Sequence, residues 1–369
     1  MASVNEQLRD ADISHAVDLQ KYSNGVVRRL IAILNRADAD LFAQLVGALE
    51  RLPAESFTVE RLETLLTSVR FVNARAYEAI GLELRDELKG LTEYEAGFQY
   101  QLFRSVIPEV LPIARMTVDL AYTAALSRPF QGRLLAEWSK SIEADRMTRI
   151  RDAVRMGYVE QQTTSQIVAR VRGTRAKGYA DGIIEIDRRN AESVVRTAIS
   201  HTAATTREGF HKENGDLIKA VSWSATLDSR TSPICRIRDG KRYTNETHKP
   251  IGHSLPWLGG PGKAHWGCRS SSVPITKSWA ELGGAVDLPE FTPSQRASMD
   301  GTVPAETTFA DWIKRQSAAR QDEVLGPARG KLMRQGGLTL DRFYNDKGSY
   351  LSLDQLRERD AAAFSKAGL

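Results

Sequence analysis

Apolar residues recur at three- and four-residue steps along most of this chain, and the period changes to two in the stretch that begins at Val221. The first spacing predicts long amphipathic helices, because residues three or four apart share one helix face. The alternation from Val221 to Leu227 predicts a strand, because successive strand side chains point to opposite faces. We therefore expect a mostly α, α+β fold with a long N-terminal helical region, a small β-hairpin domain and a helical C-terminal tail.

The helical pattern is interrupted at turn and cap signals. The pattern predicts a long helix over 14–52 that ends before Pro53, and a second over 58–88 that ends before Lys89-Gly90. A third helix is predicted over 93–106. Further helices are predicted over 134–157, 167–172, 187–212 and 308–320. Capping sequences predict helix starts at Thr163, Thr292 and Ser352, because their side chains can accept from free amides of a first turn.

The length of 369 residues indicates more than one domain, because single cores stop growing near about 250–300 residues. We expect an elongated helical region over 1–125, a second helical part over 126–215, a small β-rich part over 216–280 and a helical tail over 281–369. No apolar run reaches the length of a membrane span, and the polar N-terminus lacks a signal-peptide core. We expect a chain that stays in the cytosol unless something carries it out. Its net charge of +5 permits contact with nucleic acid or an acidic partner.

Both cysteines fall within residues 223–274, which we call the cysteine segment. It also holds a hairpin signal, Asp239-Gly240, and a Gly/Pro-rich loop over 249–264. We expect this segment to form a cross-linked knot that braces its domain. The candidate knot residues are Trp223, Asp228, Arg230, Cys235, Asp239, Gly240, His265, Cys268 and Arg269.

Thiolate and imidazole are the ligands that zinc prefers, so Cys235, His265 and Cys268 are candidate ligands of a zinc ion. A closed structural site needs a fourth ligand. Ser232 stands where a cysteine would have completed a Cys-x-x-Cys pair; the remaining candidates are Asp228, His248, His253 or a water. The alternatives are two buried thiols in a small β core, or a disulfide, which a reducing cytosol disfavours.

Two further chemistries are open. Asp228 could hold an arginine by bidentate hydrogen bonds, or act with His265 as an acid/base pair, although no nucleophile, second carboxylate or phosphate loop accompanies them. A basic region could contact DNA phosphates, or be a solvated helix face. It comprises Arg146, Arg149, Arg151, Arg155, Arg170, Arg172, Arg175 and Lys177, of which Arg146, Arg149, Arg170, Arg172 and Arg175 are the candidate nucleic-acid contacts.

The order of motifs resembles that of the phage head morphogenesis proteins, the minor head proteins of the phage Mu F and SPP1 gp7 type. The resemblance rests on Trp223-x-x-Thr-Leu-Asp228-Ser-Arg230-Thr-Ser-Pro-Ile-Cys235, on Asp239-Gly240 and on His265-Trp-Gly-Cys268-Arg269. It covers about residues 128–275. Ser232 departs from relatives that have a cysteine there, and the loop before His265 is longer than theirs.

The resemblance implies a non-enzymatic virion protein that acts in head assembly near the portal vertex. Its partners would be the portal, scaffold or major capsid protein, with packaged DNA as a further contact. Assembly would take place in the cytoplasm of the host bacterium, and the protein could leave the head with the DNA. The alternatives are a phage-delivered enzyme, either a His-metal nuclease or a toxin-like effector, and a DNA-binding packaging factor.

Overall fold

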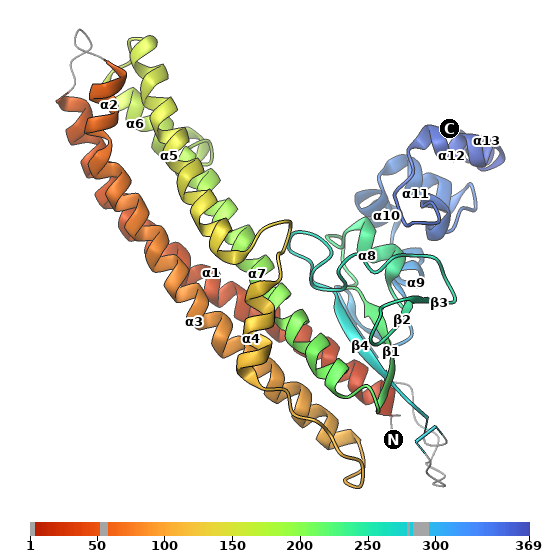
Figure 1. Ribbon diagram of the computed structural model, residues 1–369. Coiled ribbons are helices and arrows are strands. Elements are labelled where there is room, and N and C mark those ends of the chain that lie inside the picture. The colour runs from red at the N-terminus through yellow and green to blue at the C-terminus, as the bar shows by residue number, and fades with distance from the viewer. Residues whose placement is uncertain (1–3, 52–57, 279–280, 283–294) are drawn as a thin grey trace. The chain divides into compact units, whose positions relative to one another are not determined.

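The amphipathic pattern at the start of the chain forms one helix, α1 (Val4–Glu50), in a computed structural model of the protein (Figure 1). The structure describes residues 4–51, 58–278, 281–282 and 295–369. Over these residues the fold is mostly helical, with a small antiparallel sheet between a helical N-terminal region and a helical C-terminus. This confirms the predicted fold class. No helix in the described ranges is long and apolar enough to cross a membrane.

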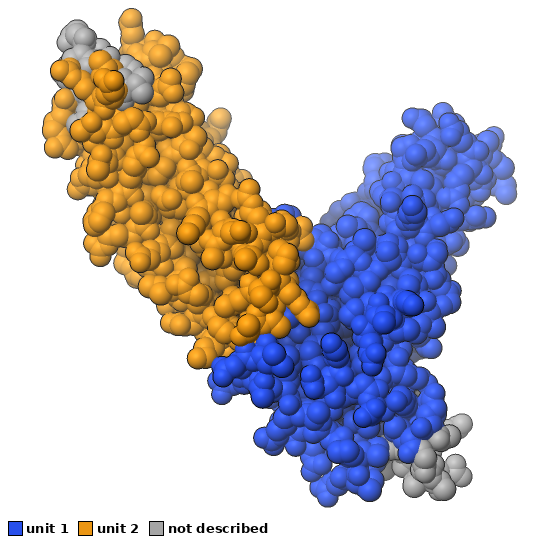
Figure 2. Space-filling model, in the orientation of Figure 1, with its two compact units in different colours: residues 1–20, 92–121, 203–369 blue, residues 21–91, 122–202 orange. Residues whose placement is uncertain are grey.

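The chain divides into two compact units, which Figure 2 colours separately. Unit 1 comprises residues 1–20, 92–121 and 203–369, and unit 2 comprises residues 21–91 and 122–202. Each unit combines segments that are far apart in the sequence. The helices α1, α3 (Thr67–Val106) and α7 (Ile183–Glu213) contribute residues to both units.

Unit 2 is built from helices that share one apolar core. Besides its parts of α1, α3 and α7, it contains α2 (Val59–Leu65), most of α4 (Val118–Ser127), α5 (Leu135–Val159), α6 (Thr164–Arg172) and the short 3-10 helix η2 (Arg175–Lys177). The core residues repeat at helical spacing: Leu41, Leu45, Leu49, Leu62, Leu66, Val69, Met147, Ile150, Val154, Ile167, Val171 and Ile184. The predicted capping box at Thr163 is confirmed, since its hydroxyl accepts from the Gln166 amide at the start of α6.

The sheet of unit 1 has the antiparallel order β3–β2–β1–β4. Its strands are β1 (Ile218–Ser224), β2 (Arg242–Thr244), β3 (Pro250–Ile251) and β4 (Ser271–Thr276). The predicted strand therefore forms, three residues earlier than expected, and becomes β1, one of the two inner strands. The ends of α1, α3 and α7 that belong to unit 1 pack against the start of β1. The buried residues of this contact are Leu8, Leu102, Phe103, Ile107, Phe210, Leu217 and Ile218.

The C-terminal part of unit 1 has its own apolar core. A hairpin of β5 (Gln295–Ser298) and β6 (Gly301–Pro304) leads into α9 (Phe309–Lys314), α10 (Ala318–Leu325), α11 (Pro327–Arg334), the 3-10 helix η3 (Leu340–Phe343), α12 (Leu353–Arg359) and α13 (Ala361–Ala367). The core includes Phe309, Trp312, Leu325, Leu332, Phe343 and Phe364. The predicted helix start at Ser352 is confirmed as the cap of α12.

Two helix predictions were wrong. A glycine costs about 1 kcal/mol inside a helix, yet α3 runs straight through Lys89-Gly90, because Leu88 and Leu91 on either side are buried. The predicted helix 308–320 is two helices, α9 and α10. The capping sequence predicted at Thr292 lies outside the described residues, which resume at Gln295, the first residue of a strand.

Candidate metal centre

Cys235 lies in the first turn of α8 (Pro233–Arg238), one of the shortest helices of the chain. Ser232 caps this helix by accepting from the Cys235 amide (3.3 Å), and Pro233 occupies the first helical position, where its missing N–H is not needed. The Ser-Pro-Ile-Cys sequence thus fixes the backbone on which the first sulfur is carried.

His265 and Cys268 lie in the loop that enters β4. The Cys268 amide donates to the His265 carbonyl (3.2 Å), and Gly267 between them has φ +60°, a conformation that glycine adopts readily. The Gly262 amide in turn donates to the Cys268 sulfur (3.3 Å). The glycines of this loop therefore turn the backbone so that the His265 and Cys268 side chains point to the same place.

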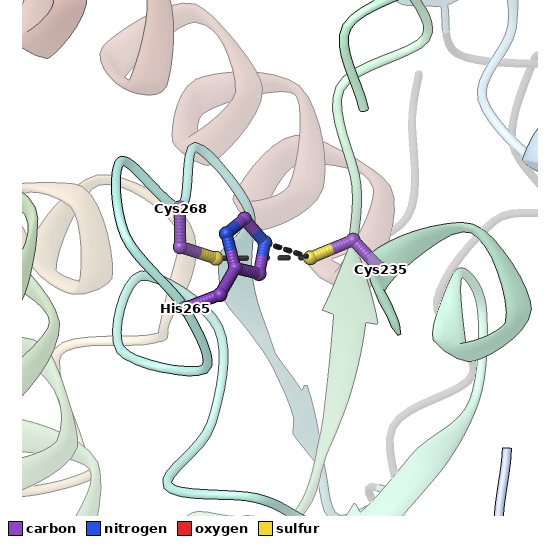
Figure 3. Close-up of side chains that lie close together, drawn as sticks. All are labelled: Cys235, His265 and Cys268. Carbon is purple, nitrogen blue, oxygen red and sulfur yellow. Dashed lines mark hydrogen bonds between the residues drawn. The ribbon is translucent and has the colours of Figure 1, made fainter. Parts of the chain in front are cut away.

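The three predicted ligands converge on one point in unit 1 (Figure 3). Cys235 Sγ lies 3.7 Å from Cys268 Sγ and 3.2 Å from His265 Nε2, and their ligand atoms all lie within 4.8 Å of one another. Both cysteines are buried and neither forms a disulfide. We call Cys235, His265 and Cys268 the Cys₂His cluster.

The cluster has the dimensions of a zinc site. Two thiolates bound to a tetrahedral zinc ion at about 2.3 Å lie about 3.8 Å apart, close to the 3.7 Å between the two sulfurs. His265 Nδ1 lies 2.9 Å from the Trp266 carbonyl, so in the neutral ring Nδ1–H donates there and Nε2 faces the sulfurs with its lone pair. A backbone partner on the far ring nitrogen is the usual support of a metal-bound histidine.

Ser232, which the sequence marks only as a serine in place of a cysteine, lies where a fourth ligand of the cluster would be. Ser232 Oγ lies 2.7 Å from His265 Nε2, beside the cluster. The other fourth-ligand candidates are engaged elsewhere: Asp228 by Arg269, His248 by stacking on Trp257, and His253 by the Arg242 carbonyl. The donor set is therefore two sulfurs, one imidazole and a hydroxyl or a water.

The contacts within the cluster shift the pKa values of its two thiols in opposite directions. The hydrogen bond between the two thiols lowers the pKa of Cys268 well below its ordinary value, with His265 adding to the effect, and raises the pKa of Cys235. Burial opposes protonation of His265, but its contact with Cys268 raises the pKa of the ring above its usual value. One sulfur is thus prepared as a thiolate, the form that binds metal.

Beside the cluster, Asp228 and Arg269 form the bidentate pair that the sequence left open. The guanidinium donates to both carboxylate oxygens at 2.5 and 2.7 Å, and Thr231 donates to one of them. Burial acts to raise the pKa of Asp228, but these hydrogen bonds hold it below its usual range. Because both oxygens are engaged by Arg269, the carboxylate does not form the acid/base pair with His265. Arg230 is exposed, and its backbone amide donates to Asp228.

Asp239-Gly240 forms a turn between α8 and β2, so the prediction of a hairpin between two strands was wrong. Lys241 N–H donates to the Arg238 carbonyl (2.9 Å), and the positive φ is confined to Gly240 (+76°). Asp239 itself is buried and bound to Arg296, a partner with no local signal in the sequence.

Trp223 is fully buried. Its ring meets Trp257 edge-on at 5.6 Å, and Arg238 lies 5.9 Å from the ring centre. Together with Tyr243 and both cysteines it forms the small apolar core around the cluster. Three of the knot residues, Trp223, Cys235 and Cys268, therefore pack into one core.

The basic region of unit 2 is largely used internally. Arg146 is buried against Asp38, which removes it from the predicted nucleic-acid contacts. Arg149 pairs with Asp187 (3.3 Å), and Arg170 pairs with Glu160. Arg172 is exposed and its guanidinium lies over the Tyr179 ring, and Arg175 is exposed.

Comparison with known families connects this geometry to one of them. Residues 144–273 match a family model described as Phage Mu protein F like protein. The match covers the whole Cys₂His cluster, the Asp228–Arg269 pair and the strands β1 and β2. This part of the chain is therefore a Phage Mu protein F-like domain. No curated protein and no solved structure gave a match.

Proposed function

We propose that this chain is a minor head protein of a tailed bacteriophage, which acts in head assembly at or near the portal vertex. The observation that carries the proposal is the Phage Mu protein F-like domain over residues 144–273, a family associated with phage head morphogenesis. The virion head would be its location, with assembly in the host cytoplasm.

The Cys₂His cluster would hold a structural Zn²⁺ ion in this protein. The sulfur separation, the orientation of His265 Nε2 and the lowered pKa of Cys268 fit such an ion. A bound ion would fasten α8, which carries Cys235, to the loop before β4, which carries His265 and Cys268. Because a metal site is rarely preformed in an unfolded chain, its binding free energy adds to the folding free energy.

The portal, scaffold or major capsid protein would bind through the apolar side chains that the helices leave exposed. In unit 2 these include Phe71 (62% exposed), Leu82 (53%) and Val159 (74%). Exposed apolar side chains are common singly, but a partner that covered these would remove their apolar area from water, which favours association.

The test is co-purification of the full-length chain with the portal protein and with procapsids. We expect the wild type to co-purify, and Leu82→Ser or Val159→Ser to weaken the association. Deletion of residues 1–125 is not a usable control, because it removes Leu8 and Phe103 from the core of unit 1. Failure of the full-length chain to bind portal, scaffold or capsid protein would overturn the proposal.

A DNA contact is the second candidate function, and Arg172 and Arg175 are the exposed arginines of the predicted set that favour it. Such binding would fall steeply as salt rises, by counterion release. Duplex DNA binding measured at low and moderate salt, with Arg175→Gln as the variant, decides the point. Binding that neither salt nor the variant changes would remove this candidate.

A further inference from the structure

Unit 1 contains a hollow of about 190 Å³ next to the Cys₂His cluster. One wall is the first part of α1, another is the end of β1 with the loop that follows, and the third is the β5–β6 hairpin. The hollow is lined by residues that include Ile13, Val17, Asp228, Arg230, Arg269 and Met299. We call this space the arginine hollow.

The charge of the arginine hollow is unbalanced. Three arginines line it, and two of them have a carboxylate partner: Arg269 is held by Asp228, and Arg296 by Asp239. Arg230 is exposed, and no carboxylate of the described residues lies within ion-pair distance of its guanidinium. Its five N–H donors are therefore available to an oxyanion from outside.

The opposite wall is apolar. It is formed by Ile13 and Ala16 of α1, by Val17, which is 40% exposed, and by Met299 at the tip of the hairpin, which is 43% exposed. A space with one apolar wall and one cationic wall matches a ligand that carries an apolar group beside an anion.

We propose that the arginine hollow binds a short acidic segment of a protein partner, with a carboxylate on Arg230 and an adjacent apolar side chain against Val17 and Met299. The volume lies below the roughly 300 Å³ at which small-molecule pockets begin, so it fits one or two side chains of a larger partner. A DNA backbone fits less well, because it has no apolar side chain to place against the wall formed by Val17 and Met299. The identity of the partner as a head protein rests on the proposed function; the binding itself does not.

The test uses the full-length chain and a short fluorescein-labelled peptide of alternating leucine and glutamate, with binding followed by anisotropy. Because the variant loses the charge-assisted hydrogen bonds to the carboxylate, we expect Arg230→Gln to weaken binding about tenfold or more. Arg230→Lys should retain part of the affinity, since lysine keeps the positive charge but cannot form the two parallel hydrogen bonds of a guanidinium. Val17→Ser should weaken binding, and Arg28→Gln, at an exposed arginine of unit 2, should leave it unchanged.

Two further peptides and one competitor sharpen the result. Glutamine in place of glutamate, or serine in place of leucine, should each reduce binding. Peptide affinity that is equal in Arg230→Gln, or no binding at millimolar peptide, would overturn the proposal; so would duplex DNA that binds through Arg230 more tightly than the peptide. The peptide experiment contains no portal protein, so it tests the hollow independently of the proposed function. If the peptide binds but the chain does not co-purify with portal protein, only the head-assembly role is contradicted.

Discussion

Asp239 and Arg296 are joined by two hydrogen bonds in the interior of unit 1, at 2.8 and 2.9 Å, although 57 residues separate them in the chain. The same carboxylate accepts from the backbone amides of Ala225 (2.7 Å) and Phe309 (2.7 Å). One aspartate therefore connects the end of β1, the β5–β6 hairpin and the first turn of α9. Its side chain is fully buried, so each of these hydrogen bonds is protected from water.

Replacement of this aspartate should be strongly destabilising. Asp239→Ala leaves the Arg296 guanidinium buried without its carboxylate, which costs about 3–5 kcal/mol of unfolding free energy. Urea unfolding of the full-length chain measures the loss. Asp322→Ala, which breaks the partly exposed pair with Arg334, is the control and should cost about 1 kcal/mol or less. Equal losses in the two variants would contradict a central role for Asp239.

The position of Ser232 predicts a gain of metal affinity from a single atom change. Ser232→Cys places a third sulfur beside His265 Nε2 and supplies the fourth protein ligand that the sequence lacks. We expect zinc affinity, measured by competition with a chelator, to rise about tenfold or more. Without metal the variant should be less stable than wild type by about 1 kcal/mol, because the serine cap of α8 is lost.

The matched control for this experiment is Ser317→Cys. Ser317 is also a helix cap, at the start of α10, but it has no place in the Cys₂His cluster. It should lose cap stability in the same way and leave zinc affinity unchanged. A rise in affinity in both variants, or in neither, would rule out Ser232 as a neighbour of the metal.

Helix caps and apolar periods could be predicted from the sequence because their partners lie within a few residues. Thr163 and Ser352 show this, since each hydroxyl accepts from an amide three positions on. Burial of Leu88 and Leu91 depends on distant packing, which is why the glycine signal at Gly90 was misleading. A local propensity of about 1 kcal/mol is easily outweighed by two buried leucines.

For the site, Cys235, His265 and Cys268 could be predicted from ligand chemistry, and Asp228 as an arginine partner from its residue type. The role of Ser232 as their neighbour could not, because serine before a proline is first of all a cap signal. The pairing of Arg296 with Asp239 could not be predicted either, because the two residues are 57 positions apart in the chain. Contacts of this kind depend on tertiary structure alone.

The turn at Gly240 should not tolerate a side chain. Its φ of +76° is strained for any L residue, and a Cβ there would also come within 3.3 Å of Thr308. Gly240→Ala is expected to lower the unfolding free energy by about 1–2 kcal/mol. Gly97→Ala is the control: this helical glycine of α3 has open space around it, so alanine should stabilise by up to about 1 kcal/mol. Urea midpoints that shift in the same direction would contradict the assignment.

The last prediction concerns the buried carboxylates of unit 1. Asp12 is completely buried; burial raises the pKa of its carboxyl to about 6, and Arg207 offsets this only in part. Glu95 is also buried, but Arg207 and a hydrogen bond with His15 (2.5 Å) outweigh burial and lower its pKa to about 2. The two carboxylates therefore respond to pH in opposite ways.

For Asp12 the folded state binds the proton more tightly than the unfolded state. Its contribution to stability is therefore full below about pH 4 and is lost as the pH rises to about 6, at a cost of about 3 kcal/mol. Asp12→Asn cannot ionise, and its side-chain oxygen can still accept from Gln99. We expect the unfolding free energy of the variant, relative to wild type, to increase by about 3 kcal/mol between pH 4 and pH 7.

The Glu95 contribution is present above about pH 4.5 and is lost as the pH falls towards 2; it is common to both proteins and cancels in the difference. Urea unfolding at matched pH values gives that difference directly. A pH-independent difference for Asp12→Asn would show that the carboxyl does not bind its proton more tightly in the folded chain.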